Sequence, residues 1–158
     1  MVKIEMENGK VIELQLFEDI APITVKNFVK LVKEGFYDGL IFHRVISGFM
    51  IQGGCPHGNG MGGASENIFG EFKLNGFNNT LSHERGVISM ARSQHPDSAS
   101  SQFFIMHKDG KFLDGQYAAF GKVVSGIEVV DEIASVRTDF RDKPIEEQKI
   151  KKITYIED

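Results

Sequence analysis

The chain has 158 residues, of which 41% are hydrophobic and 25% are charged, and its formal net charge at pH 7 is -4. This length and balance are typical of one globular domain, residues 1–158, with a core of its own, and they exclude a disordered chain. No apolar run is long enough to span a membrane, and the negative charge argues against nucleic acid as the main partner.

The first residues and the cysteine content indicate a compartment. Residues 1–5 enter an alternating strand pattern directly, without the basic and apolar regions of a secretory signal. The single cysteine, Cys55, has no cysteine partner for a disulfide or a metal site, which suits a reducing environment. We therefore expect a cytoplasmic protein.

The beginning of the chain predicts a hairpin followed by a helix. Apolar and polar residues alternate over residues 2–6 and 12–16, and Asn8-Gly9 between the two runs is a strong hairpin signal. Pro22 is then placed for the first turn of a helix, whose apolar residues keep helical spacing until Gly35, a typical stop. We expect this helix to cover one open end of a sheet.

Residues 42–54 predict two short apolar strands joined by the turn pair Ser47-Gly48. Within them, Arg44 and Gln52 place a fixed cation and an amide among apolar neighbours. A few oriented polar groups on an apolar wall are typical of a ligand site. From this stretch alone, the alternative is an edge strand whose Arg44 and Gln52 face water.

The rest of the chain continues the β pattern. Residues 54–86 are rich in Gly and Asn, and a patternless loop of this length is usually functional. Ser125 and Glu128 form a capping-box pattern that opens a second helix. Further strands are predicted at residues 86–91, 101–106, 117–124 and 148–156.

Short strands, hairpin-like links and two helices far apart in the sequence favour an antiparallel architecture over a Rossmann sheet, because no βαβ alternation is present. The prediction is a mainly β fold, a closed antiparallel barrel with helices on its ends. No internal repeat and no linker divides the chain.

Residues 58–63 match G-x-G-x-x-G literally, but the context of a dinucleotide-binding loop is missing. Such a loop should end a strand and open a helix. Here Pro56 precedes the run, and residues 65–67 follow it without helical periodicity. A flexible or ligand-flanking loop is the better interpretation.

The histidines are scattered without the spacing of a metal site. They are His43, His57, His83, His95 and His107. No nucleophile elbow supports a serine hydrolase, and no phosphate-binding loop supports a nucleoside triphosphatase. The sequence therefore predicts neither a metal nor a cofactor.

Several segments, in this order, together resemble the cyclophilin family. They are residues 42–54 (FHRVISGFMIQGG), 60–63 (GMGG), 89–91 (SMA), 101–105 (SQFFI), 112–115 (FLDG) and 120–123 (FGKV). The resemblance spans nearly the whole chain, and the chain is similar to the small, single-domain prokaryotic members of the family. It implies a closed eight-stranded barrel capped by two helices. It also implies peptidyl-prolyl cis-trans isomerase activity, which assists the folding of proline-containing polypeptides and unfolded chains. The implied enzyme is a monomer and needs no cofactor.

The resemblance also implies roles for individual residues. Arg44 matches the catalytic arginine. The pocket that receives the proline ring is matched by Phe49, Met50, Phe104 and Leu113. The other implied substrate-binding positions are His43, Gln52, Ala91, Arg92, Gln102, Phe112 and Tyr117.

Three positions depart from the best-known eukaryotic pattern. Phe112 stands where a tryptophan is usual, Tyr117 where a histidine is usual, and Arg92 where an asparagine is usual. Phe112 loses an indole donor, so we expect cyclosporin to bind only weakly. Tyr117 keeps an aromatic wall, and Arg92 adds charge beside the groove. We expect catalysis to survive and peptide preference to change.

Two other functions stay open at this point. One is a proline-peptide binding module on the same barrel, without turnover. Arg44 discriminates, because binding alone needs the apolar pocket but no cation at the twisting bond. The other is a small-ligand or metal-dependent enzyme that uses the scattered histidines.

Overall fold

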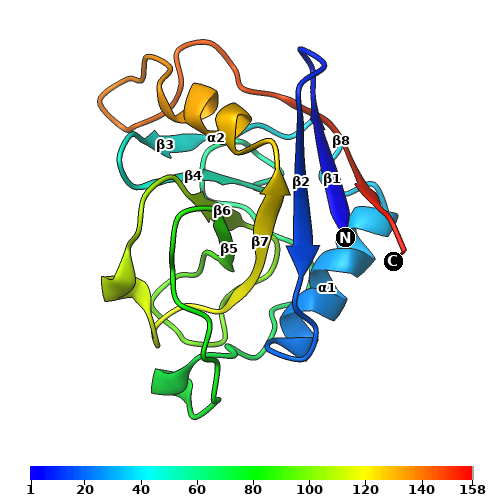
Figure 1. Ribbon diagram of the computed structural model, residues 1–158, viewed down its shortest axis with the longest axis vertical. Helices are drawn as coiled ribbons and strands as arrows, with labels where there is room; N and C mark the ends of the chain where they lie inside the picture. Colours follow the sequence, from blue (N-terminus) through cyan, green and yellow to red (C-terminus); the bar gives the residue numbers. More distant parts are fainter. Residues whose placement is uncertain (158) are drawn as a thin grey trace.

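The computed structural model describes residues 1–157, which form an eight-stranded antiparallel sheet and two α-helices (Figure 1). The helices are α1 (Pro22–Lys33) and α2 (Ile127–Ala134), and two 3-10 turns are η1 (Lys73–Asn75) and η2 (Lys111–Leu113). The strands are β1 (Val2–Met6), β2 (Val11–Leu16), β3 (Arg44–Ile46), β4 (Met50–Gly53), β5 (Val87–Met90), β6 (Phe103–Met106), β7 (Ala119–Ser125) and β8 (Ile150–Tyr155). Their order in the sheet is β3-β4-β6-β5-β7-β2-β1-β8. Within the described residues, no helix is long and apolar enough to cross a membrane.

The predicted hairpin of β1 and β2 is confirmed. Val2 lies opposite Leu14, and every second residue of both strands is buried, as the period-2 pattern requires. Gly9 adopts a φ of +86° in the turn, and the backbone N–H of Lys10 donates to Asn8 Oδ1 at 2.9 Å. The turn thus has the Asn-Gly chemistry that such hairpins favour.

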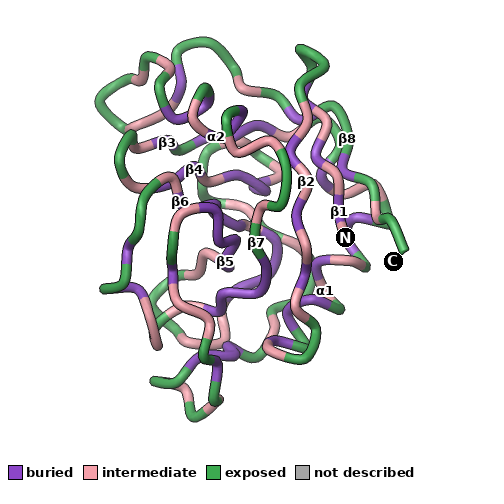
Figure 2. The backbone as a smooth tube through the Cα atoms, viewed as in Figure 1, coloured by how far each residue is buried: buried purple, intermediate pink, exposed green. Residues whose placement is uncertain are grey.

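The sheet is apolar on both faces. In Figure 2, the tube of its central strands has mostly the colour of buried residues. On the inner face, α1 contributes Phe28, whose ring centroid lies 5.2 Å from Phe120 of β7 and 5.6 Å from Phe103 of β6. A smaller apolar cluster, on the outer face, contains Met50, Phe104 and other side chains of β4 to β7. Burial on two faces explains why β5 and β6 read as continuous apolar runs without alternation.

The expected closed barrel is wrong, because the sheet is open between β3 and β8. Residues 136–149 run along the free edge of β3 instead. The backbone N–H of Val45 donates to the carbonyl of Asp142 at 2.7 Å, and one isolated bridge joins Ile41 to Lys149. β3 pairs with β4 on one side. On its other side, the loop accepts the hydrogen bond of Val45 in place of β8.

The predicted capping box at α2 is also wrong. Ser125 is the last residue of β7 and pairs with Glu13, and the helix begins at Ile127 without a side-chain cap. The residue between strand and helix is Gly126, with a φ of +87°. A Cβ on Gly126 would collide with the carbonyl oxygen of Val11. The strand therefore turns directly into the helix through a glycine.

We predict that Gly126→Ala lowers the free energy of unfolding more than Gly9→Ala does. Both substitutions put a Cβ on left-handed backbone, which costs about 1–2 kcal/mol. Only Gly126→Ala also forces a contact with Val11, since nothing lies within 4 Å of a Cβ on Gly9. Overpacking of this kind costs roughly 1–3 kcal/mol more. Urea unfolding measures the free energy of unfolding of both variants. Equal losses would show that the contact with Val11 adds no cost.

Candidate active site

A small cavity of about 130 Å³ opens on the outer face of the sheet, above the outer apolar cluster. Antiparallel register brings its walls together, because Arg44 lies opposite Gln52, and Gln52 lies opposite Phe104. Directly opposed residues point to the same face of a sheet. The cavity is lined by Arg44, Phe49, Met50, Gln52, Ala91, Arg92, Phe104, Leu113 and Tyr117. Nine of the positions implied by the resemblance therefore meet in one place.

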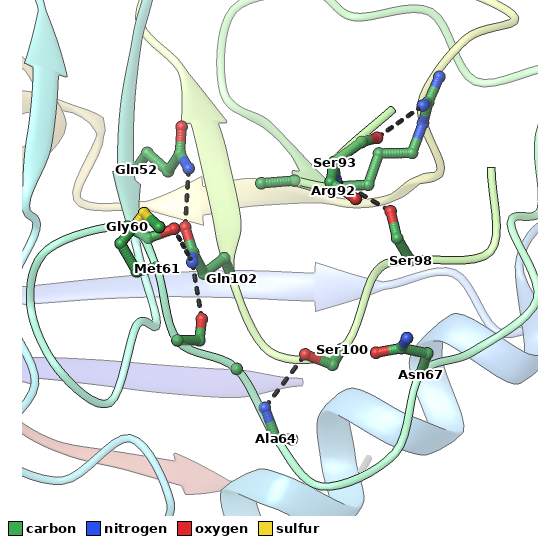
Figure 3. A pocket seen from close by; sticks show the side chains of 13 residues that line it. Gln52, Gly60, Met61, Ala64, Asn67, Arg92, Ser93, Ser98, Ser100 and Gln102 are labelled. Atoms are coloured by element: carbon green, nitrogen blue, oxygen red, sulfur yellow. Dashed lines mark hydrogen bonds between the residues drawn. The ribbon is translucent and has the colours of Figure 1, made fainter. Parts of the chain in front are cut away.

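A chain of amide hydrogen bonds orients Arg44. Its Nη1 donates to Gln52 Oε1 at 3.3 Å, and Gln52 Nε2 donates to Gln102 Oε1 at 3.0 Å. Gln102 Nε2 in turn donates to the carbonyls of Gly60 and Gly62 (Figure 3). The glycine-rich loop of residues 58–63 thus fixes the amide of Gln102. Through Gln102 and Gln52, it also orients the guanidinium of Arg44.

The same glycine-rich loop lines a second, polar cavity of about 380 Å³ next to the first one. Gln52, Ala91 and Arg92 border both cavities, and Gln102 lies in the second (Figure 3). Asn67, Ser98 and Ser100 also line it, and nothing in their local sequence indicates a site. Two features of the sequence do indicate a functional loop there: the lack of pattern in residues 54–86 and the ligand-flanking interpretation of residues 58–63.

Arg92 is a fixed part of the wall. Its guanidinium lies between the rings of Phe72 and Tyr117, 4.8 Å from each centroid, and Nη2 donates to the carbonyl of Gln116 at 2.7 Å. Cation–π stacking on two rings holds the side chain in place. The charge expected beside the groove is present, but it is engaged with the protein and holds the aromatic wall of Tyr117.

His83 supports the cavity from below. Its ring stacks on Phe104 at 6.0 Å, Nδ1 lies 2.8 Å from Asp114 Oδ1, and Nε2 lies 2.8 Å from Ser89 Oγ. Burial lowers the pKa of His83, although Asp114 opposes this shift. A carboxylate only accepts, so Nδ1 donates and the neutral ring accepts from the Ser89 hydroxyl. Ser89 is fully buried, so this Ser-His-Asp arrangement holds the pocket floor and cannot reach a substrate.

Three of the implied residues lie outside this first cavity: Gln102, which lines the second cavity, Phe112 and His43. Phe112 stands at its rim, 67% exposed, with its ring 5.6 Å from that of Phe49. His43 is only 6% exposed, and its Nδ1 is a buried atom without a hydrogen-bond partner in residues 1–157. Burial, followed by the charges of Arg44 and Lys143, lowers the pKa of His43 to about 4. His43 is therefore neutral at pH 7.

We predict that His43 makes the protein less stable in mild acid. Its pKa in the folded state is about 4 and its ordinary value is 6.5, so the unfolded chain binds the extra proton in between. Stability from this group is complete above pH 6.5 and falls as the pH drops toward 4, by about 1.4 kcal/mol per pH unit. Urea unfolding at pH 6.5, 5.5 and 4.5 should show a shallower loss for His43→Asn. Equal slopes would contradict the prediction.

Nothing in the described residues 1–157 gathers three His, Cys, Asp or Glu side chains into a metal site. The five histidines lie on separate segments, and His43 and His83 are committed to buried positions. The geometry thus offers a cation, an apolar hollow and oriented amides, which suit recognition and charge stabilisation without covalent chemistry.

Comparison with known proteins identifies the family. The family model described as cyclophilin type peptidyl-prolyl cis-trans isomerase/CLD matches residues 1–155. The chain belongs to the cyclophilin family. Among relatives, a peptidyl-prolyl cis-trans isomerase B of Bacillus subtilis is 48% identical over 130 residues, which cover 82% of this chain and 87% of that protein. Another isomerase, from Schizosaccharomyces pombe, is 45% identical over 150 residues, which cover 94% of each chain.

Solved cyclophilins agree with this assignment. The crystal structure of a cyclophilin type isomerase of Cryptosporidium parvum, in the presence of the dipeptide Ala-Pro, has a TM-score of 0.90 at 36% identity, and the match covers 99% of both chains. The resemblance inferred from the sequence is confirmed, and so is an enzyme of the peptidyl-prolyl cis-trans isomerase class.

Proposed function

We propose that this cyclophilin accelerates rotation about X-Pro bonds in polypeptides, with Arg44 as the catalytic residue and the 130 Å³ cavity as the seat of the proline ring. One observation carries the proposal. Arg44 is exposed at the mouth of an apolar hollow, oriented by Gln52, and forms no salt bridge within residues 1–157. A cation with spare donors is thus available at the place where a proline would lie.

The reaction needs only a lower barrier. Resonance gives the peptide C–N bond partial double-bond character, and rotation costs about 18–20 kcal/mol. At an X-Pro bond the two isomers differ by roughly 1 kcal/mol or less, so no energy source is required. A ten-thousandfold acceleration corresponds to about 5.5 kcal/mol of transition-state stabilisation.

Arg44 supplies the polar part of that stabilisation. In the twisted state, conjugation is lost and the proline nitrogen regains its lone pair, to which a guanidinium N–H can donate. No proton is transferred, because a guanidinium stays charged at any ordinary pH. The hydrogen bond from Nη1 to Gln52 keeps the planar group aimed before substrate arrives.

The apolar part comes from the cavity walls. Phe49, Met50, Phe104 and Leu113 would hold the ring while the acyl side of the bond turns. They also remove water, which favours the less polar twisted amide over the planar one. Binding that strengthens in the transition state raises turnover as well as affinity. The Ala-Pro dipeptide named with the Cryptosporidium structure supports a proline-containing partner.

We predict that Arg44→Ala lowers turnover far more than peptide binding. A hydrogen bond to a charged group contributes about 1.5–3 kcal/mol, so the rate should fall at least about tenfold to a hundredfold. Arg44→Lys should restore it only in part, because lysine keeps the charge but lacks the planar fork. Two-dimensional NMR exchange on a proline peptide measures dissociation constant and exchange rate separately.

Phe104→Ala is the matched variant, and it should weaken affinity and rate together because it removes an apolar wall. If Arg44→Ala leaves the exchange rate of bound peptide unchanged, the mechanism fails. Catalysis would then rest on the apolar cavity without the cation.

We predict that cyclosporin binds weakly and that Phe112→Trp strengthens binding. Phe112 already stands exposed at the rim, so an indole fits there without entering the core. The added N–H contributes roughly 1 kcal/mol, or about fivefold in affinity. Isothermal titration compares the native protein with the variant, and equal dissociation constants would contradict the prediction.

A further inference from the structure

A third hollow, of about 470 Å³, lies on the other side of Arg44 from the proline cavity. It shares Arg44 and Gln52 with that cavity, so the two hollows meet at the same pair of side chains. Its other walls are His43, the loop of residues 58–60, and the side chains of Asp139, Arg141 and Lys143. A polypeptide whose proline occupies the first cavity therefore has the third hollow within reach.

The third hollow is positively charged, although the chain as a whole carries a net charge of -4. Three cations border it: Arg44, Arg141 and Lys143. None of them forms a salt bridge within residues 1–157. Among the residues that the structure describes, Asp139 is the only carboxylate in its lining. Three positive charges against one negative charge leave an excess available to a ligand.

Asp139 offsets only part of this positive charge, because its carboxylate is turned toward its own loop. Its Oδ1 accepts the backbone N–H groups of Arg141 at 2.8 Å and Lys143 at 3.1 Å. The same two N–H groups lower the pKa of the Asp139 carboxyl. The carboxylate thus folds the turn that presents the two cationic side chains.

The loop that carries the cations is fixed to the sheet. The carbonyl of Asp142 accepts the backbone N–H of Val45 in β3, and the backbone N–H of Asp139 donates to the carbonyl of Lys143 at 2.9 Å. His43, which also lines the hollow, is neutral, in part because of the charges of Arg44 and Lys143. Arg141 and Lys143 therefore stand at a set place beside the site.

We propose that the third hollow is a subsite for an acidic side chain of the substrate, within a few residues of the proline. The inference rests on the proposed function, because the occupant belongs to the same polypeptide as the bound proline. A carboxylate suits the site, since guanidinium groups bind carboxylates through charge-assisted and often bidentate hydrogen bonds. The enzyme would thus prefer X-Pro bonds with an aspartate or glutamate nearby.

The test uses pairs of proline peptides that differ only by Glu or Gln at one position, scanned over the three residues on each side of the proline. NMR exchange gives kcat/KM for each peptide. At one position or more, Glu should exceed Gln by about twofold to fivefold, as expected for partly exposed charge pairs. This ratio should shrink as ionic strength rises, because salt screens exposed charges.

Three variants test which residues cause the preference for Glu. The measured quantity is the ratio of kcat/KM for the Glu peptide to that for the Gln peptide, because a general change of activity affects both peptides equally. The double variant Arg141→Gln/Lys143→Gln should bring the ratio close to one. Asp139→Asn should raise it, because it removes the opposing charge and keeps an oxygen for the turn. The control Lys26→Gln/Lys30→Gln removes two exposed charges from α1 and should leave the ratio unchanged.

A ratio near one at every position, or a preference that survives in Arg141→Gln/Lys143→Gln, would overturn the subsite. So would a ratio that falls in Asp139→Asn. The all-Gln peptide separates this failure from that of the proposed function. If the native protein accelerates its isomerisation while the ratio is one, only the subsite fails. If the native protein leaves the all-Gln and every Glu peptide at the uncatalysed rate, the proposed function fails.

Discussion

The register of four adjacent strands holds the site together. Arg44 of β3 lies opposite Gln52 of β4, Gln52 opposite Phe104 of β6, and Phe104 opposite Ser89 of β5. These side chains form one row across the outer face of the sheet. A slip of one residue in any of these pairings would turn a member of the row to the inner face. The cation, the amide and the apolar floor are therefore positioned by backbone hydrogen bonds, before any contact between their side chains.

Two apolar layers keep that register in place. The inner one is built on aromatic rings such as Phe28, and the outer one on Met50 and Phe104. Beneath the outer layer, His83 joins Ser89 to Asp114, so the floor of the pocket is bonded to the segment that carries Leu113. The cavity is thus a gap in the outer apolar layer, and the side chains around it are held by packing and by hydrogen bonds within the protein.

Local patterns predicted the elements well, because hairpins, helix spacing and turn residues depend on near neighbours. They also marked Arg44 and Gln52 as polar residues on an apolar wall. The opening between β3 and β8 could not be predicted, since it depends on which strand edges meet after folding. The same holds for His83, whose partners Asp114 and Ser89 come from other segments, and for Arg92, whose charge is held between two rings.

The covered edges of the open sheet bear on how this protein can handle unfolded chains. The outward N–H of Val45 in β3 is bonded to Asp142, and β8 donates from Ile150 to the carbonyl of Leu40. Uncovered edges recruit extended polypeptides as extra strands, which is a route to aggregation. These two donors are therefore not available to an extended polypeptide. If a client binds as proposed, its proline in the cavity would hold it, and the client could leave once its bond has turned.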